Sequence, residues 1–208
     1  MPETWVFAYG SLMAVDVMEG LLGRTPRPGT DFAPGWLRGW RRTWEVCTDN
    51  TDPARKVTYL SPEAEHVRPR VQVLFLDASP SPGSRLDGML LRVDPATLRR
   101  MDARERNYDR IDISEDVEDV GPEDKVWTYV GRKEQAARAR AGIVAGSARI
   151  ERGYFDRVRR ACAERSGRAG TESLPPAPEG VEIVVLDRVR HAVRPEASDL
   201  PLAPREIS

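Results

Sequence analysis

The strand candidates of this chain do not alternate regularly with helices, and this irregular order is the feature that most constrains its fold. Short extended segments stand before, between and after the helical ones, and the chain contains no internal repeat. A doubly wound parallel sheet needs a crossover helix between successive strands, so this order argues against one. We therefore predict an α+β fold with a mixed, largely antiparallel and barrel-like β-sheet flanked by helices.

The predicted strands and helices are bounded by glycine, proline and short polar residues. The strands are expected at residues 4–9, 36–46, 57–60, 71–76, 86–93, 108–117, 126–130 and 181–189. The helices are expected at residues 13–23, 95–106, 133–141 and 151–166. Pro80, Pro82 and Gly83 predict a turn that separates the strand at 71–76 from the strand at 86–93.

Length and composition describe a globular chain with one main domain. Its 208 residues are 40% hydrophobic and 31% charged, and no apolar run approaches the roughly 20 residues that a membrane-spanning helix needs. Residues 169–180 have the composition of a flexible linker. We expect one domain at residues 1–168, followed at 169–208 by this linker and a C-terminal extension that packs on the same domain.

Charge and the start of the chain bear on partners and location. The formal net charge is −1, which argues against nucleic acid as the main partner. The arginine-rich stretch at 151–168 is interpreted as a solvent face, with a nucleic-acid patch as the alternative. The first ten residues, MPETWVFAYG, carry an acid where a secretory signal carries positive charge. We expect a cytoplasmic protein that binds neither nucleic acid nor membranes.

Cysteine and histidine are scarce, and this limits the chemistry of the chain. There are two cysteines and two histidines, too few for a disulfide framework and without the spacing of a zinc site. Cys47 is interpreted as a small buried hydrophobe rather than a nucleophile, since neither histidine is obviously paired with it. We therefore expect no metal and no other cofactor, and acid–base chemistry carried by carboxylates or tyrosines.

The first candidate site is the turn that follows the first predicted strand, at residues 7–13 (FAYGSLM). A strand that ends in Gly10-Ser11 directly before a helix leaves backbone N–H groups unpaired, and these form an anion-binding nest at the positive end of the helix dipole. Gly10 would supply a backbone conformation and a close ligand approach that a Cβ blocks. The alternative is an ordinary strand-to-helix turn in which Ser11 caps the helix. The segment lacks the further glycines and the lysine of a P-loop, and it is not a dinucleotide-binding motif.

The second candidate is Glu105, near the end of the helix predicted at 95–106. Leu98, Met101 and Glu105 fall at positions i, i+3 and i+7 on one helix face, so the two apolar residues would carry the carboxylate inward. Burial and the negative end of the helix dipole both raise the pKa of a carboxyl group, which suits a general base. The arginines of this segment are expected to point outward, namely Arg99, Arg100, Arg104 and Arg106. In the alternative, the helix frays at residue 103 and Glu105 pairs with a neighbouring arginine.

Together these two segments resemble the γ-glutamylcyclotransferase-like (AIG2-like) family. The YGSL turn at 9–12 is similar to the family's N-terminal loop, and the block at 86–113 (LDGMLLRVDPATLRRMDARERNYDRIDI) is similar to its later strand, helix and strand. The resemblance extends over residues 4–167 and places Glu105 on the family's catalytic glutamate. The substrate-binding residues that it implies are Tyr9, Gly10, Ser11, Leu12, Tyr108 and Tyr154. Residues 48–85 and the tail after 168 have no counterpart in the smaller members, which leaves the choice of substrate open.

The resemblance implies a cyclotransferase that takes a γ-glutamyl amine or peptide and releases 5-oxoproline and the free amine. Glu105 would remove a proton from the α-ammonium group, and the freed amine would attack the γ-carbonyl of the same molecule. The N–H groups of the YGSL turn would stabilise the oxyanion. Such a reaction needs no cofactor. We expect a small-molecule γ-glutamyl substrate as the partner, and a monomer or a homodimer.

Two other functions remain open at this point. The same fold could act on another small amide or carbamoyl compound, in which case 5-oxoproline would not form. The chain could also be a non-catalytic binding or interaction protein that keeps the pocket and contacts a partner through its arginine-rich helix or its tail. A glutamate at position 105 that faced solvent would favour this last interpretation.

Overall fold

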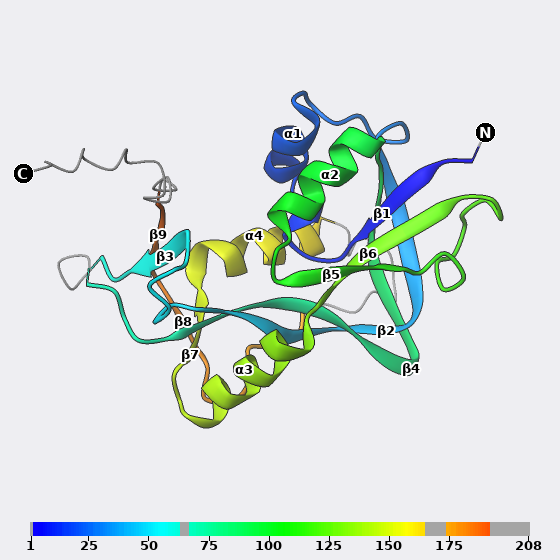
Figure 1. The fold of residues 1–208 in the computed structure, drawn as a ribbon. Coiled ribbons are helices and arrows are strands. Elements are labelled where there is room, and N and C mark those ends of the chain that lie inside the picture. The colour runs from blue at the N-terminus through cyan, green and yellow to red at the C-terminus, as the bar shows by residue number, and fades with distance from the viewer. Residues whose placement is uncertain (1, 63–66, 165–173, 192–208) are drawn as a thin grey trace, which may run out of the picture.

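The computed structural model describes residues 2–62, 67–164 and 174–191, and in this part of the chain a twisted main sheet is flanked by four α-helices (Figure 1). The strands are β1 (Thr4–Ala8), β2 (Phe32–Asp49), β3 (Val57–Leu60), β4 (Gln72–Arg92), β5 (Tyr108–Asp112), β6 (Lys125–Gly131), β7 (Ala148–Glu151), β8 (Glu182–Val184) and β9 (Asp187–Arg190). The helices are α1 (Val15–Leu22), α2 (Pro95–Arg104), α3 (Lys133–Val144) and α4 (Arg152–Ala163), and a single 3-10 turn, η1, covers Ser11–Met13. In Figure 1, α1 and α2 lie together at the top, whereas α3 lies beyond the long strands β2 and β4.

Seven strands form the main sheet, in the order β5-β6-β1-β4-β7-β8, with β2 paired to β4 outside this path. Three pairs are antiparallel (β1 with β4, β2 with β4, β5 with β6), and three are parallel (β1 with β6, β4 with β7, β7 with β8). The longest ladder, between β2 and β4, is antiparallel. β3 and β9 form a separate antiparallel pair. The predicted α+β class, with a mixed and largely antiparallel sheet, is therefore confirmed.

Strands β2 and β4 are longer than the sequence pattern predicts. The prediction that a turn at residues 80–83 separates two strands was wrong, because the single strand β4 continues through these residues. Arg38 pairs with Arg85 and Trp40 pairs with Pro80, so β4 uses more residues than β2 between the same two rungs. The extra residues form a bulge, and a bulge tolerates proline because its backbone N–H groups are not all needed for the ladder.

Other boundaries differ from the prediction for local reasons. The strand expected at 108–117 ends at Asp112, whose side chain accepts hydrogen bonds that begin a turn. The strand expected at 181–189 is two short strands, β8 and β9, which pair with β7 and β3 respectively. Helix α2 ends at Arg104, just short of its predicted end, because Glu105 leaves helical geometry (φ −86°, ψ 51°).

The start of α2 follows the sequence closely. The Asp94 side chain accepts a hydrogen bond from the Thr97 N–H at 2.6 Å, and Pro95 occupies the first turn, where a missing N–H costs nothing. Met101 is fully buried, as its spacing predicts. The helix is thus held at its N-terminus by a cap and in its second half by an apolar contact, and both orient Glu105.

One edge of strand β4 pairs with a single strand along nearly its whole length, whereas the other edge pairs with two strands that leave a gap between them. β2 pairs with β4 from Gln72 to Leu91 on the first edge. On the opposite edge, β7 pairs with Gln72 and Val73, and β1 pairs with residues 89–92. Between these two ladders, no strand in the described part of the chain pairs with that edge over residues 74–88. The candidate site lies along this gap.

Apolar side chains cover both faces of the sheet around the gap. Val6 and Phe7 are adjacent on β1, and adjacent strand residues point to opposite faces. Val6 packs in a buried cluster with Met18 and Met101, and Phe7 packs in another with residues such as Leu76. The strands that form the gap are therefore fixed by burial on both sides.

The C-terminal part of the chain is described only in part. Residues 169–173 of the predicted linker and residues 192–208 of the predicted extension lie outside the described residues. The division into a domain at 1–168 and an extension stays a prediction. None of the described helices has the length and apolar character that a membrane span requires.

Candidate active site

A small cavity lies in the gap along β4. Its volume is about 30 Å³. The lining residues are Phe7, Ala8, Tyr9, Gly10, Ser11, Leu12, Leu76, Tyr108, Tyr129 and Tyr154. All six residues that the sequence predicted for substrate binding are in this set, and none of the ten side chains is charged. A volume of this size is close to that of one water molecule in the liquid, so a larger ligand enters only when side chains at the rim move.

The YGSL turn contributes backbone N–H groups to the cavity. Within the turn, the first backbone N–H that donates a hydrogen bond is that of Met13, and its acceptor is the Gly10 carbonyl at 3.0 Å. The N–H groups of Gly10, Ser11 and Leu12 precede it and have no acceptor within the turn, as expected at the start of any helical segment. Three successive amides of this kind can bind an anionic oxygen.

The predicted roles of Gly10 and Ser11 can be compared with the structure. Gly10 has φ −133° and ψ −138°, so it lies outside the left-handed region. A Cβ added at Gly10 would meet the Tyr154 hydroxyl at 3.7 Å and the Leu76 Cβ at 3.8 Å, so the glycine leaves room in the cavity. Ser11 does not cap α1, whose N-cap is Ala14; the Ser11 Oγ accepts a hydrogen bond from Arg104 Nη2 at 3.4 Å.

A buried arginine, Arg42, binds the backbone of the YGSL turn. Arg42 on β2 is fully buried, forms an ion pair with Asp87, and donates from Nε to the Tyr9 carbonyl at 2.8 Å. The described chain contains no cis peptide bond, so the Gly10 N–H points away from the Tyr9 carbonyl and away from Arg42. The sequence analysis missed Arg42. Its signal was the period-two pattern of β2, which puts Arg42 on the same face as Trp40 and Trp44.

Three tyrosine hydroxyls are held by backbone groups around the cavity. Tyr108 donates to the Leu76 carbonyl at 2.8 Å, and Tyr154 accepts from the Leu76 N–H at 3.2 Å, so two phenols satisfy the unpaired edge of β4. Tyr9 donates to the Tyr129 carbonyl at 2.5 Å. Because Tyr154 accepts from Leu76, its own proton is available to a ligand, and no described residue accepts it.

The fourth tyrosine of the cavity, Tyr129, was not predicted. Its hydroxyl donates to Asp102 Oδ1 at 2.8 Å, which ties β6 to helix α2. Burial raises the pKa of all four phenols, those of Tyr9, Tyr108, Tyr129 and Tyr154. The phenols therefore stay protonated at neutral pH and act as hydrogen-bonding groups.

Glu105 lies at the C-terminal end of α2, beside the cavity. Its side chain is 14% exposed and its Oε1 lies 2.9 Å from Arg104 Nε. Burial raises the pKa of Glu105, and the neighbouring Arg104 offsets part of that effect. The glutamate is not one of the ten lining residues, but its backbone carbonyl accepts a hydrogen bond at 3.0 Å from the N–H of Tyr108, which is one of them. The charge of Glu105 raises the pKa of all four phenols. Each of the two alternatives for Glu105 is correct in part. The helix ends at Arg104 and Glu105 pairs with this arginine, as in the second alternative. The carboxylate is nevertheless largely buried, as in the first.

Asp77 is a second buried carboxylate near the cavity, and the sequence analysis did not identify it. Its side chain accepts hydrogen bonds from the N–H groups of Gly131 and Ala78, both at 2.8 Å. Burial raises the pKa of Asp77 to about 6. Its charge in turn raises the pKa of Tyr9, which lines the cavity. The available signal was one acid within an otherwise apolar strand, VLFLDA.

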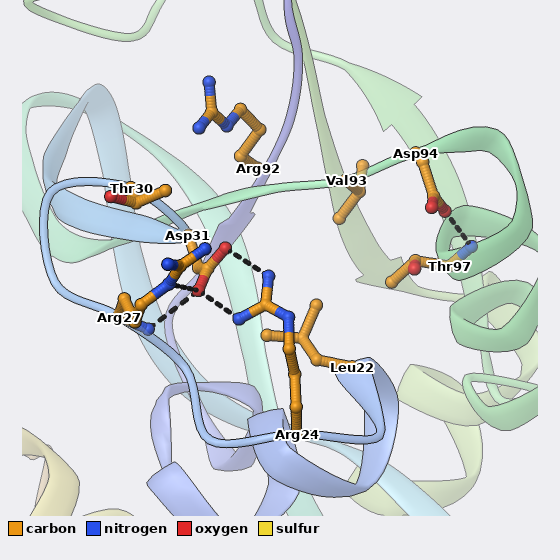
Figure 2. Close-up of a pocket in the computed structure, with 9 residues that line it drawn as sticks. All are labelled: Leu22, Arg24, Arg27, Thr30, Asp31, Arg92, Val93, Asp94 and Thr97. Carbon is orange, nitrogen blue, oxygen red and sulfur yellow. Dashed lines mark hydrogen bonds and ion pairs between the residues drawn. The ribbon is translucent and has the colours of Figure 1, made fainter.

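A larger pocket of about 400 Å³ lies elsewhere, between the end of α1, the segment before β2 and the start of α2 (Figure 2). Arg24 binds both oxygens of Asp31, at 2.6 and 2.7 Å, and the Arg27 N–H donates to the same carboxylate at 2.8 Å. The hydrogen bonds from Arg24 and Arg27 hold the pKa of Asp31 well below its usual range. Figure 2 shows both arginines directed at Asp31, with Arg92 apart from them. This pocket holds none of the predicted site residues.

Cys47 lies on β2 and is buried. Burial raises the pKa of its thiol to about 11, so the thiol stays protonated at neutral pH, as expected for a small buried hydrophobe. Within the described residues, no three His, Cys, Asp or Glu side chains gather in an arrangement that could hold a metal ion.

Comparisons with known proteins concern most of the described chain. The model of a family described as "Gamma-glutamyl cyclotransferase, AIG2-like" matches residues 6–153, which include the YGSL turn, Glu105 and Tyr108 and stop one residue before Tyr154. No curated protein matches the chain.

Three solved structures are similar to this one. The human protein loc79017 is 12% identical over 85% of this chain and 92% of its own, with a TM-score of 0.50. A structure named "Gamma-glutamyl cyclotransferase" is 12% identical over 83% of this chain and 89% of its own, with a TM-score of 0.46. The Arabidopsis thaliana protein At5g39720.1 is 22% identical over 64% of this chain and 72% of its own, with a TM-score of 0.41. At these identities, the likeness to the human protein concerns the fold alone.

Proposed function

This chain belongs to the gamma-glutamyl cyclotransferase, AIG2-like family, and we propose that it cyclises a γ-glutamyl compound to 5-oxoproline with Glu105 as general acid and base. The observation that carries the proposal is the position of Glu105. It is a largely buried carboxylate beside a cavity whose ten lining side chains are all uncharged. A single proton-transfer group and a set of N–H donors are sufficient for an intramolecular acyl transfer.

The γ-glutamyl part of the substrate occupies the widened cavity. Its α-carboxylate and its γ-carbonyl oxygen face the N–H groups of Gly10, Ser11 and Leu12. The free O–H of Tyr154 supplies a further donor next to Gly10. The α-ammonium group lies against Glu105, where it takes the place of the Arg104 guanidinium.

The reaction then moves two protons away from the α-nitrogen. Glu105 removes a proton from the α-ammonium group, and the freed nitrogen attacks the γ-carbonyl carbon to close a five-membered ring. The N–H groups of the YGSL turn stabilise the negative oxygen of the tetrahedral intermediate. Glu105 returns the first proton to the leaving nitrogen as the original amide bond breaks. The ring nitrogen loses its second proton to the released amine, which leaves as an ammonium ion beside 5-oxoproline.

The raised pKa of Glu105 gives this scheme a pH signature. The carboxylate must be ionised to accept the first proton, so kcat falls as pH drops through the pKa of Glu105. Because burial raises that pKa, the acid limb of the profile lies above the range of an ordinary glutamate. A profile of kcat against pH measures the position of this limb directly.

The test is product detection by mass spectrometry with the purified protein and a panel of γ-glutamyl amino acids, γ-glutamylamines and glutathione. We expect 5-oxoproline from the wild type and none from Glu105→Gln, with Glu123→Gln as the matched control because Glu123 is exposed. Circular dichroism verifies that both variants are folded. Full activity of Glu105→Gln contradicts the proposed role. Silence of the folded wild type across the panel favours another amide substrate or a binding function.

A further inference from the structure

Arg104 spans the two sides of the candidate site. Its Nε lies 2.9 Å from Glu105 Oε1, and its Nη2 donates to Ser11 Oγ at 3.4 Å. The guanidinium therefore joins the end of α2 to the YGSL turn. Arg104 is exposed, as the sequence predicts, but its guanidinium reaches across to the YGSL turn instead of lying free in solvent.

The neighbouring arginines do not share this position. Arg100 donates to Thr97 Oγ1 within its own helix, and Arg106 donates to the Ala103 carbonyl. Arg104 is thus the arginine of this segment that contacts both the general base and the turn. Since the ten lining side chains are uncharged, its guanidinium is the positive group at the rim of a neutral cavity.

Arg104 is also more exposed than the glutamate with which it pairs. Its side chain is 35% exposed, against 14% for Glu105, so it is the outer member of the pair. A cavity of about 30 Å³ admits a substrate only after a group at its rim moves. When the substrate's ammonium group pairs with Glu105, the guanidinium loses its partner and is free to bind another carboxylate.

We propose that Arg104 binds the carboxylate of the leaving amino acid and is the residue that makes this chain prefer γ-glutamyl amino acids over γ-glutamylamines. This inference rests on the proposed cyclotransferase function. The leaving nitrogen of such a substrate is two bonds from its carboxylate carbon, and it departs toward the exposed side where Arg104 lies. A guanidinium offers two parallel N–H donors to a carboxylate, which favours this substrate over one that carries only an alkyl group.

The experiment compares two substrates that differ only in this carboxylate, γ-glutamyl-alanine and γ-glutamyl-ethylamine. We expect the wild type to prefer γ-glutamyl-alanine in kcat/KM by about 30-fold, the range of a charge-assisted pair of hydrogen bonds. Arg104→Gln reduces the preference to about 3-fold or less, and Arg100→Gln leaves it unchanged. Any change that Arg104→Gln causes in Glu105 affects both substrates alike and cancels in the ratio.

Two outcomes overturn the assignment of Arg104. One is a wild type that does not distinguish the two substrates. The other is an Arg104→Gln variant that loses activity on both equally, which would place the guanidinium against the glutamyl part or make it a support for Glu105.

Calorimetric binding to the Glu105→Gln protein separates this inference from the proposed reaction, because it requires no turnover. We expect γ-glutamyl-alanine to bind more tightly than γ-glutamyl-ethylamine, and the difference to vanish when Arg104→Gln is added. Equal affinities overturn the role of Arg104. Unequal affinities without any 5-oxoproline from the wild type support Arg104 and contradict only the reaction.

Discussion

The small cavity beside Glu105 and the large pocket around Asp31 contain the same kinds of charged group in opposite states. In the large pocket the Asp31 carboxylate is bound on both oxygens by Arg24 and has a pKa held low. Beside the small cavity the Glu105 carboxylate has one arginine contact and a pKa raised by burial. The pKa of Asp31 is lowered by its hydrogen bonds, whereas the pKa of Glu105 is raised by burial.

The difference teaches that volume is a poor guide to the site in this fold. The large pocket has more than ten times the volume of the small cavity, yet its carboxylate, Asp31, already forms ion pairs with Arg24 and Arg27. The small cavity has unbonded turn amides and a tyrosine with an available proton. Catalysis requires hydrogen-bonding groups that are free to bind the substrate and the transition state. The turn amides and the Tyr154 hydroxyl at the small cavity are groups of this kind.

The strongest way to break this comparison is to neutralise each acid in turn. Glu105→Gln should lower kcat for 5-oxoproline release about 10³-fold, because an amide neither accepts nor returns the proton. Asp31→Asn should leave kcat unchanged. Steady-state kinetics on both folded variants measure the two effects. A loss of turnover in Asp31→Asn as large as that in Glu105→Gln would move the site to the large pocket.

The next effect concerns the buried arginine beneath the turn. Arg42→Lys keeps the charge but loses the Nε–H that holds the Tyr9 carbonyl, so the Gly10 N–H is no longer aimed at the oxyanion. We expect kcat to fall about 10²-fold with KM little changed. The free energy of unfolding should fall on the order of 3 kcal/mol as the buried pair with Asp87 is weakened.

Urea titration and kinetics on the same sample separate the two effects of Arg42→Lys. Arg38→Lys is the matched control on β2, since Arg38 is exposed and bonds to the Glu115 carbonyl. An Arg42→Lys protein with reduced stability and full kcat would contradict a positioning role for Arg42.

A third effect is the pH dependence of stability at Asp77. Its folded-state pKa of about 6 lies above the ordinary value of 3.8, so the folded protein binds this proton more tightly than the unfolded chain does. Stability from this group is present below about pH 4 and is lost as pH rises through about 6, by about 2–3 kcal/mol. In Asp77→Asn, which keeps an acceptor for the Gly131 N–H, this loss should disappear.

The measurement for Asp77 is urea unfolding of the wild type and of Asp77→Asn at several values between pH 4 and pH 7. The difference between the two proteins isolates Asp77 from the other groups that titrate in this range. A difference that stays constant with pH would show that the buried carboxyl does not change its protonation on folding.

The smallest effect is expected at the large pocket. Asp31 itself is only 8% exposed, but its partner Arg24 is 47% exposed and stays hydrated in Asp31→Asn, so Tm should fall by no more than a few degrees and less in high salt. Because the pKa of Asp31 is lowered, its contribution is present above the ordinary carboxyl pKa and is lost as pH falls below it. Differential scanning calorimetry at pH 7 and pH 3 measures this. A larger loss of stability at pH 3 than at pH 7 would contradict the assignment.

Much of this molecule follows from local sequence alone. Asp94 and Pro95 predict the start of α2, and the spacing of Leu98, Met101 and Glu105 predicts its inward face. The YGSL turn at 9–12 is predicted by the strand before it and the helix after it. These features depend on residues that are close in sequence, so periodicity and capping rules are sufficient to find them.

The tertiary structure decided which distant groups meet. The Tyr9 hydroxyl bonds a carbonyl 120 residues away, and Arg42 reaches the Tyr9 carbonyl across 33 residues. Both contacts depend on the register of β1, β2, β4 and β6, including the bulge of β4 that the prolines were expected to make into a turn. Strand register is set by packing over the whole sheet rather than by any local pattern. This is why the roles of Arg42, Asp77 and Tyr129, and the contact of Arg104 with Ser11, became clear only in the folded chain.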